Sequence, residues 1–243
     1  MTTLSLHARS AGEILDAAFQ IYRSRWIPMV AATAVLVLPV LLIQAAAPLE
    51  VLPMLDAVSN LFFLAATAAV VVIASGVYTG RDVGAMEAVQ TLGGRFFSVW
   101  GAAIVQGILI FVGLMLLVVP AFIFGAWTFA MQQAVMIEGR TAGDAFGRSR
   151  ELARGHVKHI LVTMLLAVAI VYTAVLGVAF LVGIAFAGER TWALALSLAL
   201  VALNPITAVV GTVLYYDLRI RKEAFDVQVA ADRLAEPESL ALA

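Results

Sequence analysis

Two groups of basic side chains are the residues in this sequence that could bind a charged ligand. They are Arg150, Arg154, Lys158, Arg219, Arg221 and Lys222. The first three are spaced four residues apart, so on a helix they would form one basic stripe, and the last three lie near the C-terminus. Basic residues at a membrane surface attract anionic lipid headgroups, each contributing about 1 kcal/mol. The same pattern also arises from the positive-inside bias alone, and Asp217 could neutralise part of the second group.

Uncharged polar side chains inside the apolar segments form a second candidate site. They include Asn60, Gln106 and Asn204, and Asn204 immediately precedes Pro205. A proline within a membrane helix removes an amide donor and frees a carbonyl one turn back, as in the broken helices that line transport sites. These residues could therefore line a neutral polar path. The alternative is that the proline only kinks a packed helix.

The sequence contains no arrangement that predicts catalysis or metal binding. It has no cysteine, which removes thiol nucleophiles and thiolate ligands. His156 and His159 are three residues apart but lack an obvious third ligand. The acid pair Glu13 and Asp16 has no partner for general acid–base work. We therefore expect neither enzymatic activity nor a cofactor.

The composition predicts that these residues belong to an integral membrane protein. Of the 243 residues, 63% are hydrophobic and only 13% are charged, whereas soluble chains carry about 25% charged residues. The apolar residues occur in blocks of about 20, the length that a helix needs to cross a bilayer. We place six spans, at residues 26–47, 57–79, 97–119, 120–137, 159–187 and 191–216. The turn between the third and fourth spans is placed at Pro120 and must be very short.

The distribution of charge predicts the orientation of these spans. No Asp, Glu, Lys or Arg falls well inside a predicted span, which argues against an ion-coupled pump. Each of the 15 Lys and Arg residues except Arg190 lies before the first span, in the second or fourth connection, or after the last span. Basic residues are retained on the cytoplasmic side, so both termini are expected there.

The cytoplasmic segments of the chain resemble one another. Ser10, Thr79 and Thr141 each stand three residues before a carboxylate, the spacing of a capping box at a helix N-terminus. We expect amphipathic helices in the inner interface at about residues 10–24, 81–94 and 142–156. An interfacial helix followed by a membrane hairpin would then occur three times, in parallel repeats. Chance is the alternative, because any protein with this topology has three such segments.

Three segments are similar to a family of bacterial membrane proteins. Residues Leu214 to Asp226 resemble the closing motif of the glycerophosphoryl diester phosphodiesterase membrane domain family, and Gly12 to Arg23 resemble its start. Residues Glu138 to Ser149 resemble its middle, so the likeness spans most of the chain. Some members attach this region to a soluble phosphodiesterase barrel, which carries their chemistry. Too few residues follow Arg219 for such a barrel, so the resemblance implies a membrane domain without that activity.

These patterns favour a non-enzymatic, all-α, multi-pass protein of the bacterial inner membrane. Residues 1–226 would form a single membrane domain, and residues 227–243 a cytoplasmic tail. The expected role is structural or partner-binding, with the basic cytoplasmic face presented to another membrane or cytoplasmic protein or to anionic lipids of the bilayer. Nucleic acid is not an expected partner. The alternative function is a transporter or lipid-handling protein that uses the neutral polar path.

Overall fold

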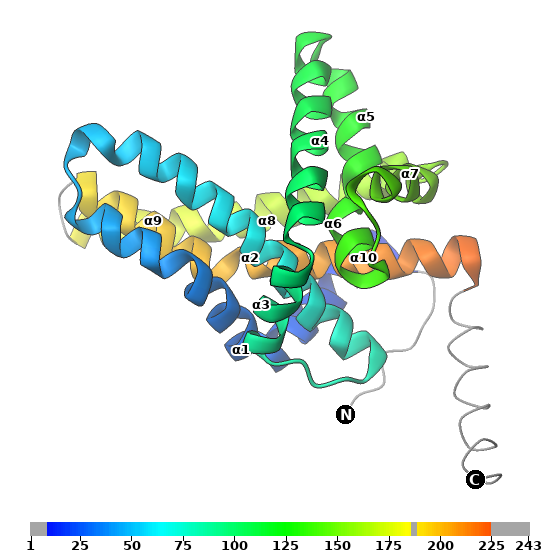
Figure 1. Ribbon diagram of the computed structural model, residues 1–243, viewed down its shortest axis with the longest axis horizontal. Coiled ribbons are helices and arrows are strands. Elements are labelled where there is room, and N and C mark those ends of the chain that lie inside the picture. The colour runs from blue at the N-terminus through cyan, green and yellow to red at the C-terminus, as the bar shows by residue number, and fades with distance from the viewer. Residues whose placement is uncertain (1–8, 186–188, 225–243) are drawn as a thin grey trace, which may run out of the picture.

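The computed structural model describes residues 9–185 and 189–224, and every regular element within these ranges is helical (Figure 1). The elements are α1 (Ala11–Ala46), η1 (Leu49–Val51), α2 (Leu52–Thr79), α3 (Ala85–Gly94), α4 (Phe96–Met115), α5 (Val118–Thr128), α6 (Met131–Glu138), α7 (Ala142–Ala153), α8 (Val157–Ala185), α9 (Glu189–Leu203) and α10 (Pro205–Glu223). The predicted all-α class is confirmed for this part of the chain. The predicted tail, residues 227–243, lies outside the described residues.

Six helical segments of the described chain are long and apolar enough to cross a membrane. They are Ala11–Ala46, Leu52–Thr79, Phe96–Met115, Val118–Glu138, Val157–Ala185 and Thr191–Glu223. Large apolar side chains on these helices are exposed, among them Phe97, Phe111 and Leu181. Such a surface is compatible with lipid, because lipid tails are as apolar as these side chains. The prediction of six apolar helices of membrane-spanning length is therefore confirmed.

The first predicted interfacial helix and the first predicted span form one long helix, α1. Its capping box is present, since the Ser10 hydroxyl accepts the Glu13 N–H at 3.4 Å and the Glu13 carboxylate accepts the Ser10 N–H at 2.7 Å. Where the sequence predicted a boundary between the two, α1 has a kink at Arg25, whose backbone is not helical. Pro28 explains this kink, because proline has no N–H to donate to the carbonyl one turn earlier.

The second predicted interfacial helix differs from its prediction. α3 begins at Ala85 after Gly84, without a side-chain cap, so the prediction of a capping box at Thr79 is wrong. The Thr79 hydroxyl instead donates back to carbonyls within α2, and Gly80, in the left-handed conformation, ends that helix. The third predicted cap is confirmed, because the Thr141 hydroxyl accepts the Asp144 N–H at the start of α7.

The turn between α4 and α5 is as short as expected, but it lies before the predicted position. It consists of Leu116 and Leu117, and Pro120 occupies the first turn of α5, where its missing N–H is not needed. A Cβ atom added at Gly113 would lie 2.5 Å from the Cα of Ala121. This glycine therefore lets the backbones of α4 and α5 touch and closes the hairpin.

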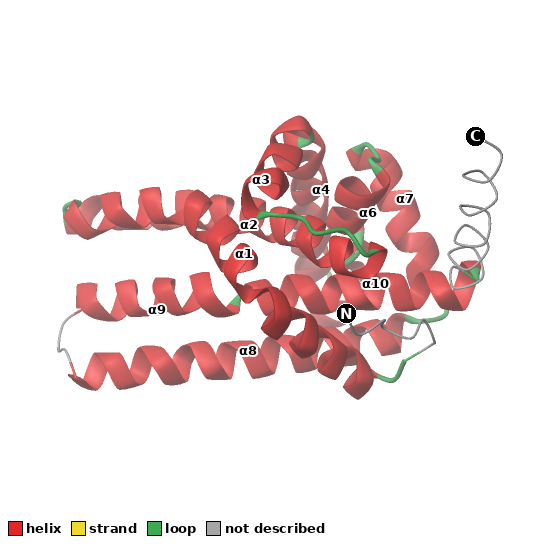
Figure 2. Ribbon diagram, turned by 90° about the horizontal axis from the view of Figure 1, so that it is seen from below, coloured by secondary structure: helices red, strands yellow, loops and turns green. Residues whose placement is uncertain are grey.

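The three hairpins do not form one parallel bundle. In Figure 1 the α1–α2 and α8–α9 hairpins extend to the left, whereas the α4–α5 hairpin points upward, and Figure 2 shows α2, α9 and α8 running in a similar direction. α1 packs against α2, α9 and α10, and α10 also packs against α2 and α8. α4 packs mainly against α5, α6 and α7, and α5 reaches α8. The α4–α5 hairpin thus diverges from a bundle built by the other two.

Side-chain hydroxyl groups form hydrogen bonds with backbone groups at two points where a long apolar segment is broken into two helices. Between α5 and α6, the buried Ser149 hydroxyl accepts the N–H of Ala130 at 3.1 Å. Between α9 and α10, the Tyr22 hydroxyl donates to the carbonyl of Ala202. Pro205 cannot continue the helical hydrogen bonding at that point, so Tyr22 supplies a donor beside the break.

Candidate functional site

The basic residues at the end of α10 already have hydrogen-bond partners, two of them on α10 itself. The Nε of Arg219 donates to Glu223 at 3.1 Å, and the Nε of Arg221 donates to Asp217 at 2.8 Å. The Nζ of Lys222 donates to the carbonyl of Glu151. Asp217 therefore neutralises Arg221, one of the alternatives that the sequence left open. All three cations already have partners within the protein, which reduces their capacity to bind an external ligand.

Asp217 is a fully buried carboxylate with three polar groups around it. It accepts the backbone N–H of Arg9 at 2.6 Å and the Nε of Arg221, and it lies 3.3 Å from Nε2 of His159. The Arg9 guanidinium extends to the hydroxyl of Tyr78 at 2.6 Å. A buried charge is tolerated only when it is paired and hydrogen-bonded. These contacts therefore fasten the start of the described chain to the ends of α2, α8 and α10.

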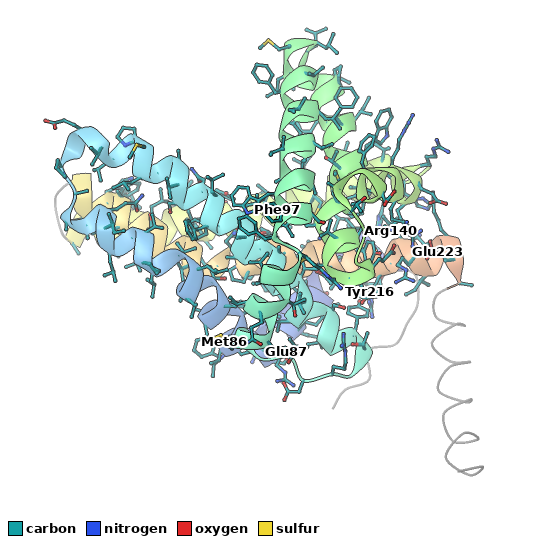
Figure 3. All side chains as sticks on the ribbon, viewed as in Figure 1. Met86, Glu87, Phe97, Arg140, Tyr216 and Glu223 are labelled. Atoms are coloured by element: carbon teal, nitrogen blue, oxygen red, sulfur yellow. The ribbon has the colours of Figure 1, made fainter. Side chains whose placement is uncertain are left out.

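Glu138, Arg148, Tyr215 and Glu223 form a second set of paired groups, which we call the closed cluster. The Arg148 guanidinium donates to Glu138 at 2.9 Å and 3.0 Å and also to Glu223, while the Tyr215 hydroxyl donates to Glu138. The hydrogen bond to Glu223 raises the pKa of Arg148 above its ordinary value, against the opposing effect of burial. Figure 3 labels Glu223 in this part of the molecule, together with Arg140 and Tyr216.

The side chains of the closed cluster are arranged to stabilise the fold and not to catalyse a reaction. Its acids already face a guanidinium or a phenol, so neither is poised to take a proton from a substrate. Sequence reasoning did not identify it. The available signal was only that Glu138 and Arg148 fall in the segment resembling a family motif, because no spacing rule connects these residues to Tyr215.

The remaining basic candidates surround the α7–α8 connection, and we call Arg150, Arg154 and Lys158 the basic junction. The helix predicted at about residues 142–156 ends three residues earlier, because α7 stops at Ala153 and Gly155 adopts a positive φ of 80°. All three side chains are exposed. The Arg150 guanidinium lies 4.8 Å from the centroid of the Trp127 ring in α5. Arg154 and Lys158 have no side-chain ion pair or hydrogen bond within the described residues.

An apolar groove of about 470 Å³ lies between the divergent hairpin and α8. It is lined by Gln106, Ile110, Leu114, Val118, Ala121, Phe122, Gly125, Ala126, Phe129, Ile160, Leu161, Met164, Leu165 and Val168. On α8 the lining begins two residues after Lys158. On α5, Trp127 and the Arg150 guanidinium over it lie near the same end of the helix, but on the side away from the lining residues. The basic junction is therefore at one end of this groove.

The residues of the predicted polar path are not brought together in this groove. Asn60 is exposed on α2, and Gln106 lines the groove as its only polar side chain. Asn204 lies at the break between α9 and α10, where its Oδ1 accepts the Thr207 hydroxyl at 3.2 Å. Neither Asn60 nor Asn204 lines the groove. At Asn204, the contacts are those of a packed helix break.

The two histidines of the predicted α7–α8 region have different partners. His159 faces Asp217, whereas Nδ1 of His156 lies 3.2 Å from the Arg154 carbonyl. Across residues 9–185 and 189–224, no group of three or more His, Asp or Glu side chains is placed to hold a metal ion. The histidines are thus not brought together at one site.

Comparisons with known proteins yield no match: no protein-family model, no curated protein and no solved structure matches this chain. The geometry of the basic junction and of the groove beside it must therefore support any functional assignment.

Proposed function

We propose that this chain is a non-enzymatic, multi-pass protein of a bacterial inner membrane that acts as a binding module for an anionic partner. The contact surface is the basic junction. One observation carries this proposal: Arg154 and Lys158 are exposed and unpaired within the described residues, whereas the cations of α10 are paired inside the protein. Unpaired cations at a membrane surface retain their full attraction for an anion.

The proposed topology places both termini on the cytoplasmic side and divides the chain into three parallel units. The units are α1–α2, α3–α6 and α7–α10, each a short polar helical segment followed by long apolar helices. The second and third units are joined by the bond between Glu138, at the end of one, and Arg148, in the other. The resemblance to the glycerophosphoryl diester phosphodiesterase membrane domain family is part of the same proposal.

The alternative, a transporter or lipid-handling protein, has one observation in its favour. The groove beside α8 is apolar except for Gln106, so its chemistry suits a lipid chain better than a polar solute. Of the two forms of this alternative, the groove therefore supports lipid handling and not passage along a neutral polar path.

Photo-crosslinking in the native membrane tests the proposed function. A photoreactive residue replaces His156, which lies inside the basic junction, and a matched control replaces Gln90 on the exposed side of α3. We expect a discrete adduct by intact mass from position 156 only, and its loss when Arg150, Arg154 and Lys158 are changed to Gln. An adduct that survives these three changes, or no adduct from position 156, would contradict the proposal. Hydrolysis of glycerophosphodiesters by the purified protein would contradict its non-enzymatic part.

A further inference from the structure

We infer that the groove between α4, α5 and α8 binds an acyl chain of an anionic phospholipid, whose phosphate is held by the basic junction. This inference rests on the proposed function, because it identifies the anionic partner. It joins two neighbouring features: an apolar channel that can accept a chain, and unpaired cations at one end of that channel.

The groove has the size and lining of a ligand site. Its volume of about 470 Å³ falls within the range of roughly 300–1,000 Å³ that is typical of small-molecule sites. The lining consists of aliphatic and aromatic side chains with Gln106 as the single polar member. A chain entering from the bilayer gains little hydrophobic free energy, because lipid tails are already in an apolar medium. The groove therefore positions a lipid but cannot select one.

Selection must come from the charges at the end of the groove. Lys158, Leu161 and Leu165 are at positions i, i+3 and i+7 of α8, so the ammonium group and two lining residues share one side of that helix. Arg150 lies over Trp127, on the side of α5 that faces away from the lining residues. A phosphate at this end would therefore meet Lys158 and Arg154, the cations of the α7–α8 connection that are exposed and unpaired within the described residues. Each such charge contributes about 1 kcal/mol at a membrane surface.

The length of the groove matches one leaflet. On α8 it extends to Val168, and the rise of a helix from Lys158 to that residue is about 15 Å. A bilayer hydrocarbon core is about 30 Å thick, so this distance is about half of it. A phospholipid with its phosphate at the basic junction would therefore place one chain along α8 through the inner leaflet.

Native mass spectrometry of the full chain in a nonionic detergent tests the headgroup contact. The protein is titrated with phosphatidylglycerol or with phosphatidylcholine carrying the same acyl chains. We expect preferential retention of phosphatidylglycerol, reduced about fivefold by Lys158→Gln and again by Arg154→Gln. Arg81→Gln, which removes an exposed charge from the α2–α3 connection, is the matched control and should change nothing. Inorganic phosphate in excess should not displace the lipid.

Filling the groove tests the chain contact. A Cβ atom at Gly125, which lines the groove, would meet no atom within 4 Å, so Gly125→Leu projects into free space. Gly107 on α4 has the same free space but does not line the groove, so Gly107→Leu is the matched control. We expect Gly125→Leu to reduce retention of both lipids at least fivefold and Gly107→Leu to leave it unchanged. Val168→Phe, at another lining position, provides a second filling variant.

The outcomes separate the inference from the proposed function. If both filling variants retain phosphatidylglycerol as the unmodified protein does, while Lys158→Gln loses it, the chain site is wrong and the anion-binding function stands. If inorganic phosphate displaces the lipid, the site takes a soluble anion and the inference is overturned. If the unmodified protein retains the two lipids equally, the inference is also overturned. If the photo-adduct at position 156 is with a protein instead of a lipid, the proposed binding function stands and the lipid inference is overturned.

Discussion

Arg148 and Arg150 stand two residues apart on α7, yet they belong to two different kinds of charged region. Arg148 is in the closed cluster, where its side chain is 10% exposed and bonds to Glu138 and Glu223. Arg150 is in the basic junction, exposed and stacked over Trp127. Residues two apart on a helix point to different sides. α7 therefore separates charges that hold the protein together from charges that are available to a ligand.

This difference changes how the basic residues of a membrane protein are interpreted. The positive-inside pattern indicates on which side a cation lies, but not whether it is paired. The cations of α10 and those of the basic junction look alike in a charge count, but Arg219 and Arg221 each pair with an acid four residues away on the same helix. A charge count therefore overestimates the surface that is available for binding.

The largest expected effect is from breaking the closed cluster. Arg148→Gln removes the partly buried cation that Glu138 and Glu223 share, and losing hydrogen bonds to two charged groups costs about 2–3 kcal/mol. We expect a clear decrease in the unfolding midpoint in detergent. Arg150→Gln on the same helix should leave that midpoint unchanged. Equal midpoints for the two variants would remove the distinction between the two regions.

Asp217→Asn should have the next largest effect. The amide keeps the shape of the side chain but removes the charge that Arg221 and the Arg9 N–H share, at a cost of about 2 kcal/mol. A double-mutant cycle with Arg221→Gln measures the interaction between the two groups. If the free energies of the single changes simply add, Asp217 does not hold Arg221.

Gly113→Val should open the divergent hairpin, with an effect of about 1–3 kcal/mol from overpacking. The added side chain would collide with the backbone of Ala121, whereas the same change at Gly107 meets no neighbour. Limited proteolysis at the α4–α5 turn provides the measurement. The expectation is faster cleavage of Gly113→Val only, and unchanged cleavage rates for both variants would contradict the close contact.

Tyr22→Phe should have the smallest effect, about 1 kcal/mol or less, because it removes one hydrogen bond at the break between α9 and α10. Thermal unfolding of this variant, compared with Tyr172→Phe on the exposed surface of α8, isolates that contact. A midpoint as high as that of the Tyr172→Phe control would indicate that the Ala202 carbonyl does not need the Tyr22 hydroxyl.

Local patterns in the sequence predicted the local features of the fold. Runs of apolar residues predicted the long helices, and the spacing of Ser10 and Glu13 predicted the start of α1. Thr79 shows the limit of such patterns, because the same spacing was overridden by Gly80, which ends α2 first. Pro120 marked the right turn but not its position, since proline is tolerated in the first turn of α5.

The candidate sites depended on contacts that no local pattern encodes. The pairing of Glu138 with Tyr215 joins residues 77 apart in the sequence. The groove exists because the α4–α5 hairpin diverges from the other two, and that direction follows from packing against α6 and α7. Of the predicted polar path, only Gln106 lines a described cavity, because burial and direction cannot be read from residue type.

A comparison of two triple variants tests which basic residues bind the lipid and which stabilise the fold. In the first, Arg150, Arg154 and Lys158 are changed to Gln, and in the second, Arg219, Arg221 and Lys222 are changed to Gln. The unfolding midpoint and the retention of phosphatidylglycerol are measured for both. We expect the first variant to lose the lipid at an unchanged midpoint, and the second to unfold at lower temperature while its folded fraction keeps the lipid. The reverse pattern would contradict the assignment of the basic junction as the contact surface.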